Sequence, residues 1–201
     1  MLLAMEDREG TLMDIPRILT ESSFRKNKLK ICKDELVRKF WENEAEEAGR
    51  DMSLSNIAPY ITSKLNSFIY NHYLRAIVSQ PKSTINFSKC MNEGKIILIN
   101  LSKGCLGNRN ADMIGMFLIN RIFLAALSRF NIAPEKRKRF TLYIDEFQNF
   151  TTDNIAHIFA EARKFNLSLI CANQNLAQLK KEICESALGT VGNILCFRPG
   201  I

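Results

Sequence analysis

The sequence of 201 residues predicts an α/β fold, in which a parallel sheet with helices on both faces is preceded by an all-helical part. Up to Gln80, apolar residues recur at helical spacing, which predicts helices only. From Pro81 onward, short apolar runs typical of buried strands alternate with helical patterns. We therefore expect an all-helical subdomain over residues 1–80 and an α/β domain over residues 81–201.

The all-helical part is expected to contain three helical segments. A short one covers residues 12–20, a second runs over 34–48, and a third apolar stripe extends over 57–77. Gly49 is suited to end the second helix, because glycine readily adopts the left-handed conformation that closes helices. Trp41 lies on the apolar stripe of the second helix, so we expect it in the core of this part.

The second part alternates strands with helices. Four continuous apolar runs are expected to form strands, at residues 96–99, 140–144, 167–172 and 194–197. Helical patterns lie between these runs, at residues 112–128, 155–165 and 176–188. Asn166 is suited to end the middle helix, because asparagine tolerates the left-handed conformation. Strands joined by helices in this order lie parallel in one sheet.

Cysteine spacing and hydropathy restrict the class of protein. The six cysteines stand singly, which fits neither a zinc cage nor a disulfide framework, so we expect no metal cluster and a cytoplasmic protein with reduced thiols. No signal peptide is expected, because acidic residues follow the first few apolar ones. The longest apolar stretch, residues 113–127, is shorter than the about 20 residues that span a bilayer, so this piece is not expected to cross a membrane.

The net charge of +7 comes entirely from the second part. Residues 1–80 carry 12 basic and 12 acidic side chains, whereas residues 81–201 carry 16 basic and 9 acidic ones. A basic surface suits a polyanionic partner such as DNA, although proteins with other partners share this charge. The basic run at residues 136–139 either contacts DNA phosphates or, as we favour, forms a solvated loop before a strand.

Polar residues follow each of the four expected strands. In parallel sheets, the ligand crevice lies beyond the carboxyl ends of the strands. The polar or glycine residues at these positions, in strand order, are Asn100, Ser102, Lys103 and Gly104; then Asp145, Glu146 and Gln148; then Asn173 and Gln174; and finally Arg198 and Gly200. Loops are polar in any case, but four such ends in register favour a site for phosphate, metal or water.

The pair Asp145–Glu146 is the strongest single indication of chemistry. An apolar strand that ends in two carboxylates is typical of a Walker B motif, in which the first acid anchors hydrated Mg²⁺ and the second orients the attacking water. The alternative is an acidic surface pair before a helix. Gln174 follows the next strand as a polar side chain suited to contact a phosphate or the water, and Asn173 is suited to cap the following helix.

Several segments of the sequence resemble the conjugative coupling-protein ATPases, the TraD/TraG-type group of type IV secretion systems within the HerA/FtsK class of DNA pumps. The similar segments are GKIILINLSKGCLG, LYIDEFQNFTTDNIAHIFAEARKFNLSLICANQNLAQL, GNILCFRPG and, in the helical part, FRKNKLKICKDELVRKFWENE. The resemblance implies a RecA-like fold with an all-helical insertion. It also implies that Asp145 and Glu146 form Walker B, that Gln174 is the sensor-like residue, and that Arg198 is an arginine finger.

The same resemblance implies cofactors, partners and a location. ATP and Mg²⁺ would bind the intact protein, with Asp145 holding Mg²⁺ through water. The partners would be DNA, further copies of the chain in a hexameric ring, and other secretion-system components. The intact protein would be cytoplasmic, anchored to the inner face of the cell membrane.

The sequence departs from this family in one respect, because no G-x-x-x-x-G-K-[S/T] phosphate-binding loop occurs in it. Gly94-Lys95 is followed by Ile96 instead of a hydroxyl residue, and Lys89 stands where the first glycine belongs. Either the chain is a fragment that begins after its phosphate loop, which we favour, or it is a degenerate paralogue or non-catalytic interaction subunit. In either case, we expect no tight binding of ATP to this chain alone.

Overall fold

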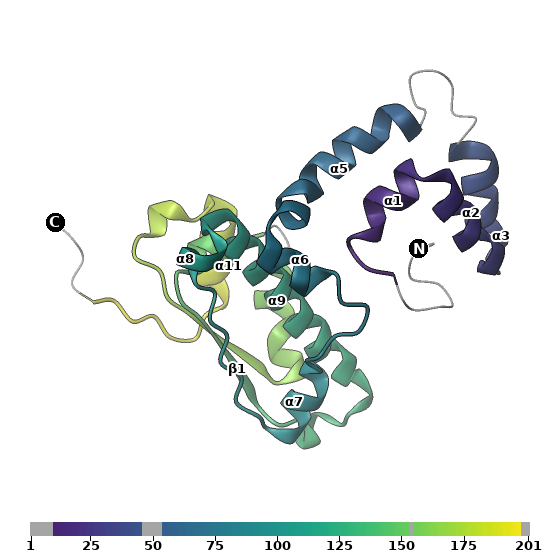
Figure 1. Ribbon diagram of the computed structural model, residues 1–201. Helices are drawn as coiled ribbons and strands as arrows, with labels where there is room; N and C mark the ends of the chain where they lie inside the picture. Colours follow the sequence, from purple (N-terminus) through teal and green to yellow (C-terminus); the bar gives the residue numbers. More distant parts are fainter. Residues whose placement is uncertain (1–9, 46–53, 153–154, 198–201) are drawn as a thin grey trace. The chain divides into compact units, whose positions relative to one another are not determined.

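The computed structural model describes residues 10–45, 54–152 and 155–197 (Figure 1). The fold is mostly helical, with a small two-stranded parallel sheet in the C-terminal half. Contacts within the chain divide it into two compact units, Met1–Thr84 and Ile85–Ile201, which are described separately below.

The first unit is built from helices. In chain order these are α1 (Asp14–Thr20), α2 (Ser22–Ile31), α3 (Glu35–Lys39), the π-helical turn η2 (Phe40–Glu44), α5 (Leu54–Tyr70) and α6 (His72–Val78). Helix α1 packs against both α2 and α5. Ile18, Leu29, Cys32 and Val37 form a small buried cluster. Trp41 packs against this cluster and remains half-buried, so the expectation that it belongs to the core is confirmed in part.

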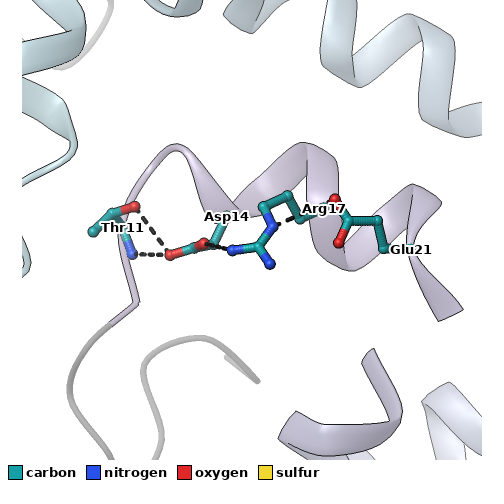
Figure 2. Close-up of polar contacts among 4 residues, drawn as sticks. All are labelled: Thr11, Asp14, Arg17 and Glu21. Carbon is teal, nitrogen blue, oxygen red and sulfur yellow. Dashed lines mark hydrogen bonds and ion pairs between the residues drawn. The ribbon is translucent and has the colours of Figure 1, made fainter. Parts of the chain in front are cut away.

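Local polar contacts determine where α1 begins (Figure 2). The carboxylate of Asp14 accepts hydrogen bonds from both the backbone nitrogen and the hydroxyl of Thr11, each at 3.0 Å, and the backbone nitrogen of Asp14 donates to the Thr11 carbonyl at 3.1 Å. These contacts close the turn over residues 11–14 from which α1 starts, while the N-cap residue Met13 makes no side-chain cap bond. Arg17 then bridges Asp14 at 3.1 Å and Glu21 at 3.4 Å, as Figure 2 shows. The expected helix at residues 12–20 is therefore confirmed.

Two features of the first unit differ from the sequence-based expectation. Helix α2 was not predicted as a separate element, although it lies in the part that was expected to be all-helical; its buried residues are Arg25 and Leu29. The stripe expected over residues 57–77 is divided into α5 and α6 at Asn71, whose side chain accepts hydrogen bonds from the backbone nitrogens of Tyr73 and Leu74 at 3.0 and 3.1 Å. Gly49 lies outside the described residues.

The second unit combines helices with the two-stranded sheet. It contains α7 (Phe87–Glu93), α8 (Lys103–Leu106), α9 (Asn108–Leu127), β1 (Phe140–Ile144), α10 (Ile155–Glu161), β2 (Leu167–Cys171) and α11 (Lys181–Thr190). Short 3₁₀ turns are η3 (Ser128–Asn131), η4 (Pro134–Lys136), η5 (Phe147–Phe150), η6 (Ala162–Phe165) and η7 (Leu176–Gln178). Asn166 ends η6 in the left-handed conformation, with φ 57°, as the sequence predicted. The strands expected at residues 140–144 and 167–172 are confirmed, and they pair in parallel.

One face of the sheet packs against the core of this unit. The core includes Met91 from α7, Ile122 from α9, Ile158 from α10 and Ile183 from α11, all of which are buried. The opposite face is open at its centre, because the paired residues Tyr143 and Ile170 are 71% and 49% exposed. Helices were expected on both faces, and at these two positions the second face is not covered.

The strands expected at residues 96–99 and 194–197 do not form. Neither segment pairs with a neighbouring strand within the part of the chain that the structure describes. Most of their apolar side chains face solvent, with Leu98 at 92% and Phe197 at 89% exposure, whereas Ile97 packs against the core. An apolar run predicts that a segment will be buried, but a strand also needs a neighbour that offers backbone partners. No such neighbour lies beside either segment among the described residues, so the strands expected at 96–99 and 194–197 are absent.

Two arginines connect the segment before β1 with the turn η6, which precedes β2. Arg129 is fully buried and donates to the carbonyls of Phe165 at 3.1 Å and Lys138 at 2.5 Å. Burial, and secondly the charge of Arg137, lower the pKa of Arg129. Arg137 itself donates to the carbonyls of Ile132 at 2.8 Å and Lys164 at 2.5 Å. Within the basic run 136–139, Arg137 therefore has a structural role rather than that of a solvated or DNA-contacting side chain.

The helical segment Asn108–Asn131 is long and apolar enough to cross a membrane, judged by length and composition only. The expectation from the sequence counted only the shorter apolar stretch within it. This criterion is weak evidence, since core helices of soluble proteins also meet it. Ile119, Ile122 and Ala126 on this helix are buried in the core of the second unit.

Candidate functional site

The pairing of β1 with β2 continues beyond the ends of both strands. The backbone nitrogen of Ala172 donates to the carbonyl of Ile144 at 2.9 Å, and the nitrogen of Phe147 donates to the carbonyl of Ala172 at 2.9 Å. These two hydrogen bonds fix the turn after β1 directly beside the segment after β2. The residues expected at the carboxyl ends of the two strands consequently lie side by side.

Glu146 occupies the centre of this turn in an uncommon backbone conformation. Its φ of 51° and ψ of 45° are in the left-handed region, which costs about 1–2 kcal/mol for a residue other than glycine. The turn is held by the backbone nitrogen of Glu146, which donates to Oδ1 of Asp145 at 3.0 Å, and by that of Asn149, which donates to the Glu146 carbonyl at 2.9 Å. Residues held in such conformations cluster at functional sites, where the surrounding structure enforces them.

Two amide side chains hold the carboxylate of Glu146. Nε2 of Gln174 donates to Oε1 of Glu146, and Nε2 of Gln148 donates to Oε2, each at 2.5 Å. Gln174 is 28 residues from Glu146 in sequence and comes from the neighbouring strand end. Each carboxylate oxygen has two lone pairs, so each can still accept a hydrogen bond from water. The carboxylate is thus oriented, yet retains capacity for a water molecule.

Asp145 precedes Glu146 and is exposed. Mg²⁺ binds oxygen ligands, keeps several waters, and is usually held by one or two carboxylates together with substrate phosphates. Asp145 fits one such carboxylate. Within the described residues there is no group of three or more metal-binding side chains, so Asp145 would need phosphate oxygens and water to complete the ion's coordination.

Gly94-Lys95 does not form a phosphate-binding loop. Gly94 adopts the left-handed conformation, with φ 73°, and ends α7. The backbone nitrogen of Lys95 donates to the carbonyl of Cys90 at 2.9 Å, which completes this helix end. Gly94-Lys95 therefore serves as a helix end and not as a phosphate cradle.

The structure brings together three of the four expected site residues, Asp145, Glu146 and Gln174. The fourth, Arg198, lies outside the described residues. Asn173 does not cap the following helix. Asn175 caps the 3₁₀ turn η7, because its side chain accepts from the backbone nitrogen of Ala177 at 2.9 Å, and helix α11 begins at Lys181 without a side-chain cap. The Asn173 expectation was therefore wrong.

Gln148 is a partner of Glu146 that sequence reasoning did not include in the site. The available signal was its position among the polar residues that follow the strand. Its Oε1 atom is buried and has no hydrogen-bond partner in the described part of the chain. Nearby, burial raises the pKa of Cys171, the last residue of β2, to about 11, so its thiol is neutral at physiological pH.

Comparisons with protein-family models, with curated proteins and with solved structures found no match to this chain.

Proposed function

We propose that this chain is part of a DNA-translocating motor ATPase of the conjugative coupling-protein kind, and that it supplies the Walker B and water-orienting residues. The observation that carries the proposal is the hydrogen bond between Gln174 and Glu146 across the ends of two adjacent parallel strands. An acidic surface pair has no need of two amides on one carboxylate or of a left-handed backbone at Glu146. Both features support a catalytic role for this side chain.

In the proposed fold, β1 and β2 are two strands of a larger RecA-like sheet, and residues 1–80 are the all-helical insertion. The extended apolar segments 96–99 and 194–197 are its further strands. Their exposed side chains support this assignment, because such segments are stable only when a sheet covers them.

ATP and Mg²⁺ are the cofactors of the proposed activity. ATP would supply the phosphoryl group, and Mg²⁺ would supply the positive charge that neutralises the negative charge of the phosphate oxygens. Asp145 would hold the metal through water. Glu146 orients the attacking water, and Gln148 positions Glu146. Gln174 keeps one N–H and its carbonyl oxygen for the water or phosphate. The phosphate-binding loop has to be supplied from outside these 201 residues.

The further parts of the proposal rest on the resemblance described above. Arg198 acts as an arginine finger, the motor is a homo-oligomeric ring that is a hexamer by resemblance, and DNA and other secretion-system components are its partners. The motor works in the cytoplasm at the inner face of the membrane. The basic excess of residues 81–201 is compatible with DNA as cargo.

The proposal is tested on the polypeptide that contains both this chain and a phosphate-binding loop, for which the coding DNA upstream of the Met1 codon should be read. Mg-ATP hydrolysis is measured with and without DNA. Asp145→Asn should weaken Mg²⁺-dependent ATP binding, whereas Glu135→Gln, which removes an exposed carboxylate elsewhere, should not. Arg198→Ala subunits should regain activity when mixed with Glu146→Gln subunits if Arg198 acts across an interface. Normal hydrolysis by Asp145→Asn would refute the assignment.

The second candidate is a non-catalytic interaction subunit or a degenerate paralogue of such an ATPase. The observation that favours it is the absence of a phosphate-binding loop from the sequence. This candidate predicts that no polypeptide containing the chain hydrolyses ATP through Glu146.

A further inference from the structure

The helical unit contains a hollow of about 350 Å³ that plays no part in the site at the strand ends. Its walls come from α2, α3 and the π-helical turn η2. The lining residues are Arg25, Lys26, Leu29, Lys30, Arg38, Trp41 and Glu42. Its volume is within the range of small-ligand sites, and π-helical turns such as η2 occur often at functional positions.

Positive charge predominates in the hollow, with four cationic side chains against one carboxylate. The carboxylate, Glu42, is 3.7 Å from Arg38, and both side chains are half exposed, so this pair is weak. Lys26 is exposed and makes no ion pair or hydrogen bond within the described part of the chain. Lys30 makes only a long hydrogen bond of 3.4 Å to Asn27. Several positive groups can therefore turn to an anion without loss of strong internal bonds.

Arg25 differs from the other cations, because it is only 7% exposed. Its guanidinium donates to the carbonyl of Ile18 at 2.9 Å, which links α2 to α1 and holds the side chain in place. A guanidinium has five N–H donors in a rigid fork. It adds fixed positive potential to the hollow and helps to define its shape.

An apolar surface lies beside these cations. Leu29 is buried in the cluster of the first unit, and Trp41 packs against that cluster while remaining half-buried. The indole of Trp41 lines the hollow next to lysines and arginines, and such a combination is suited to a ligand with a flat ring and a phosphate. An acidic peptide would use the cations, but not the indole face.

We propose that this hollow binds a nucleotide, whose phosphate is held by Lys26, Lys30 and Arg38 and whose base stacks on Trp41. The nucleotide is either free or an unpaired unit of a single strand. The inference does not rest on the proposed ATPase function, because its residues lie in the other unit and share nothing with Glu146.

Trp41 is the single tryptophan of the chain, so its fluorescence reports directly on this hollow. The full chain is titrated with thymidine monophosphate, with a short oligothymidylate, with inorganic phosphate and with an oligoglutamate peptide. We expect saturable quenching by thymidylate. Quenching by the monophosphate identifies free nucleotide as a sufficient ligand, whereas quenching by the oligomer alone identifies a single strand. Quenching by neither, or equal quenching by oligoglutamate, overturns the proposal.

Matched variants then test the contacts. Lys26→Gln removes a lining cation, and Lys39→Gln removes one positive charge from an exposed α3 residue that does not line the hollow. Lys26→Gln should weaken thymidylate binding by about three- to fivefold. A plot of the logarithm of the oligomer binding constant against the logarithm of the salt concentration should become less steep by about 0.7. Lys39→Gln should change neither. Equal effects of the two variants would show that only overall charge matters and would refute a built site.

Discussion

Replacing Arg129 by methionine should loosen the second unit by an amount that the structure allows us to estimate. Arg129 is fully buried and donates to the carbonyls of Phe165 and Lys138, one at the end of η6 and one just before β1. Hydrogen bonds to a charged group each contribute about 1.5–3 kcal/mol net. Methionine replaces the chain of arginine only as far as Nε, lacks the guanidinium and satisfies neither carbonyl.

We expect Arg129→Met to cost about 3 kcal/mol, the lower end of the sum for two bonds. The lower end applies because removing a buried charge also removes the free-energy cost of keeping that charge away from water. The same burial is the main reason that the pKa of Arg129 is lowered. Arg129→Lys keeps the charge but offers one compact donor group in place of the fork, so it should give an intermediate loss.

Amide hydrogen exchange read by mass spectrometry is the suitable assay, because it reports on β1 and η6 separately from the helical unit. Peptides that cover residues 138–147 and 162–172 should exchange about a hundredfold faster in Arg129→Met. Arg163→Met, which removes an exposed arginine from η6, is the control and should change exchange little. Exchange in Arg129→Met that matches the wild type would refute the reasoning.

Three further predictions concern packing, titration and association. A Cβ on Gly115 would lie 2.2 Å from Cε1 of Phe150. Gly115→Ala should therefore lower the melting temperature, because a clash of about 1–3 kcal/mol exceeds the helix-propensity gain of about 1 kcal/mol. Adding Phe150→Leu to this variant should restore the melting temperature, whereas unchanged melting of Gly115→Ala alone would contradict the prediction. Burial raises the pKa of Cys171 from 9.0 to about 11, so stability should fall as pH rises from 9 towards 11, where the thiol ionises only in the unfolded chain. Alkylation at mildly alkaline pH should therefore label exposed Cys105 about a hundredfold faster than Cys171, and equal rates would exclude the shift. Leu98 is 92% exposed on an extended segment and should promote self-association. Leu98→Lys should therefore shift sedimentation towards the monomer. A wild-type chain that is already monomeric would count against this prediction.

The sequence predicted the elements that are determined locally. Strands β1 and β2 are continuous apolar runs, and Asn166 has the backbone tolerance needed to end η6. Their parallel pairing follows from the helical crossover between them, and it brings Glu146 beside Gln174 as expected. These predictions succeeded because each depends on residues near in sequence, or on the topology of a single strand–helix–strand unit.

The remaining features depend on contacts that a single sequence does not display. Residues 96–99 have the apolar run of a strand but lack a partner in the described chain, so the same pattern gives an exposed extended segment. Gln148 joins the site through a tight turn at Glu146, whose left-handed conformation is not indicated by its residue type. Arg137 was interpreted as part of a basic run, although its guanidinium donates to three backbone carbonyls. Charge in a sequence does not reveal whether it faces solvent or backbone.

The central claim is that Glu146 is a catalytic carboxylate held by two glutamines. It is tested most directly by measuring ATP binding and ATP turnover of the Glu146→Gln variant in the polypeptide that also contains the phosphate-binding loop. Glutamine has nearly the same shape but no negative charge, so binding should remain within a few-fold of wild type, while turnover should fall by about a hundredfold or more. Turnover at the wild-type rate, with binding intact, would contradict the account.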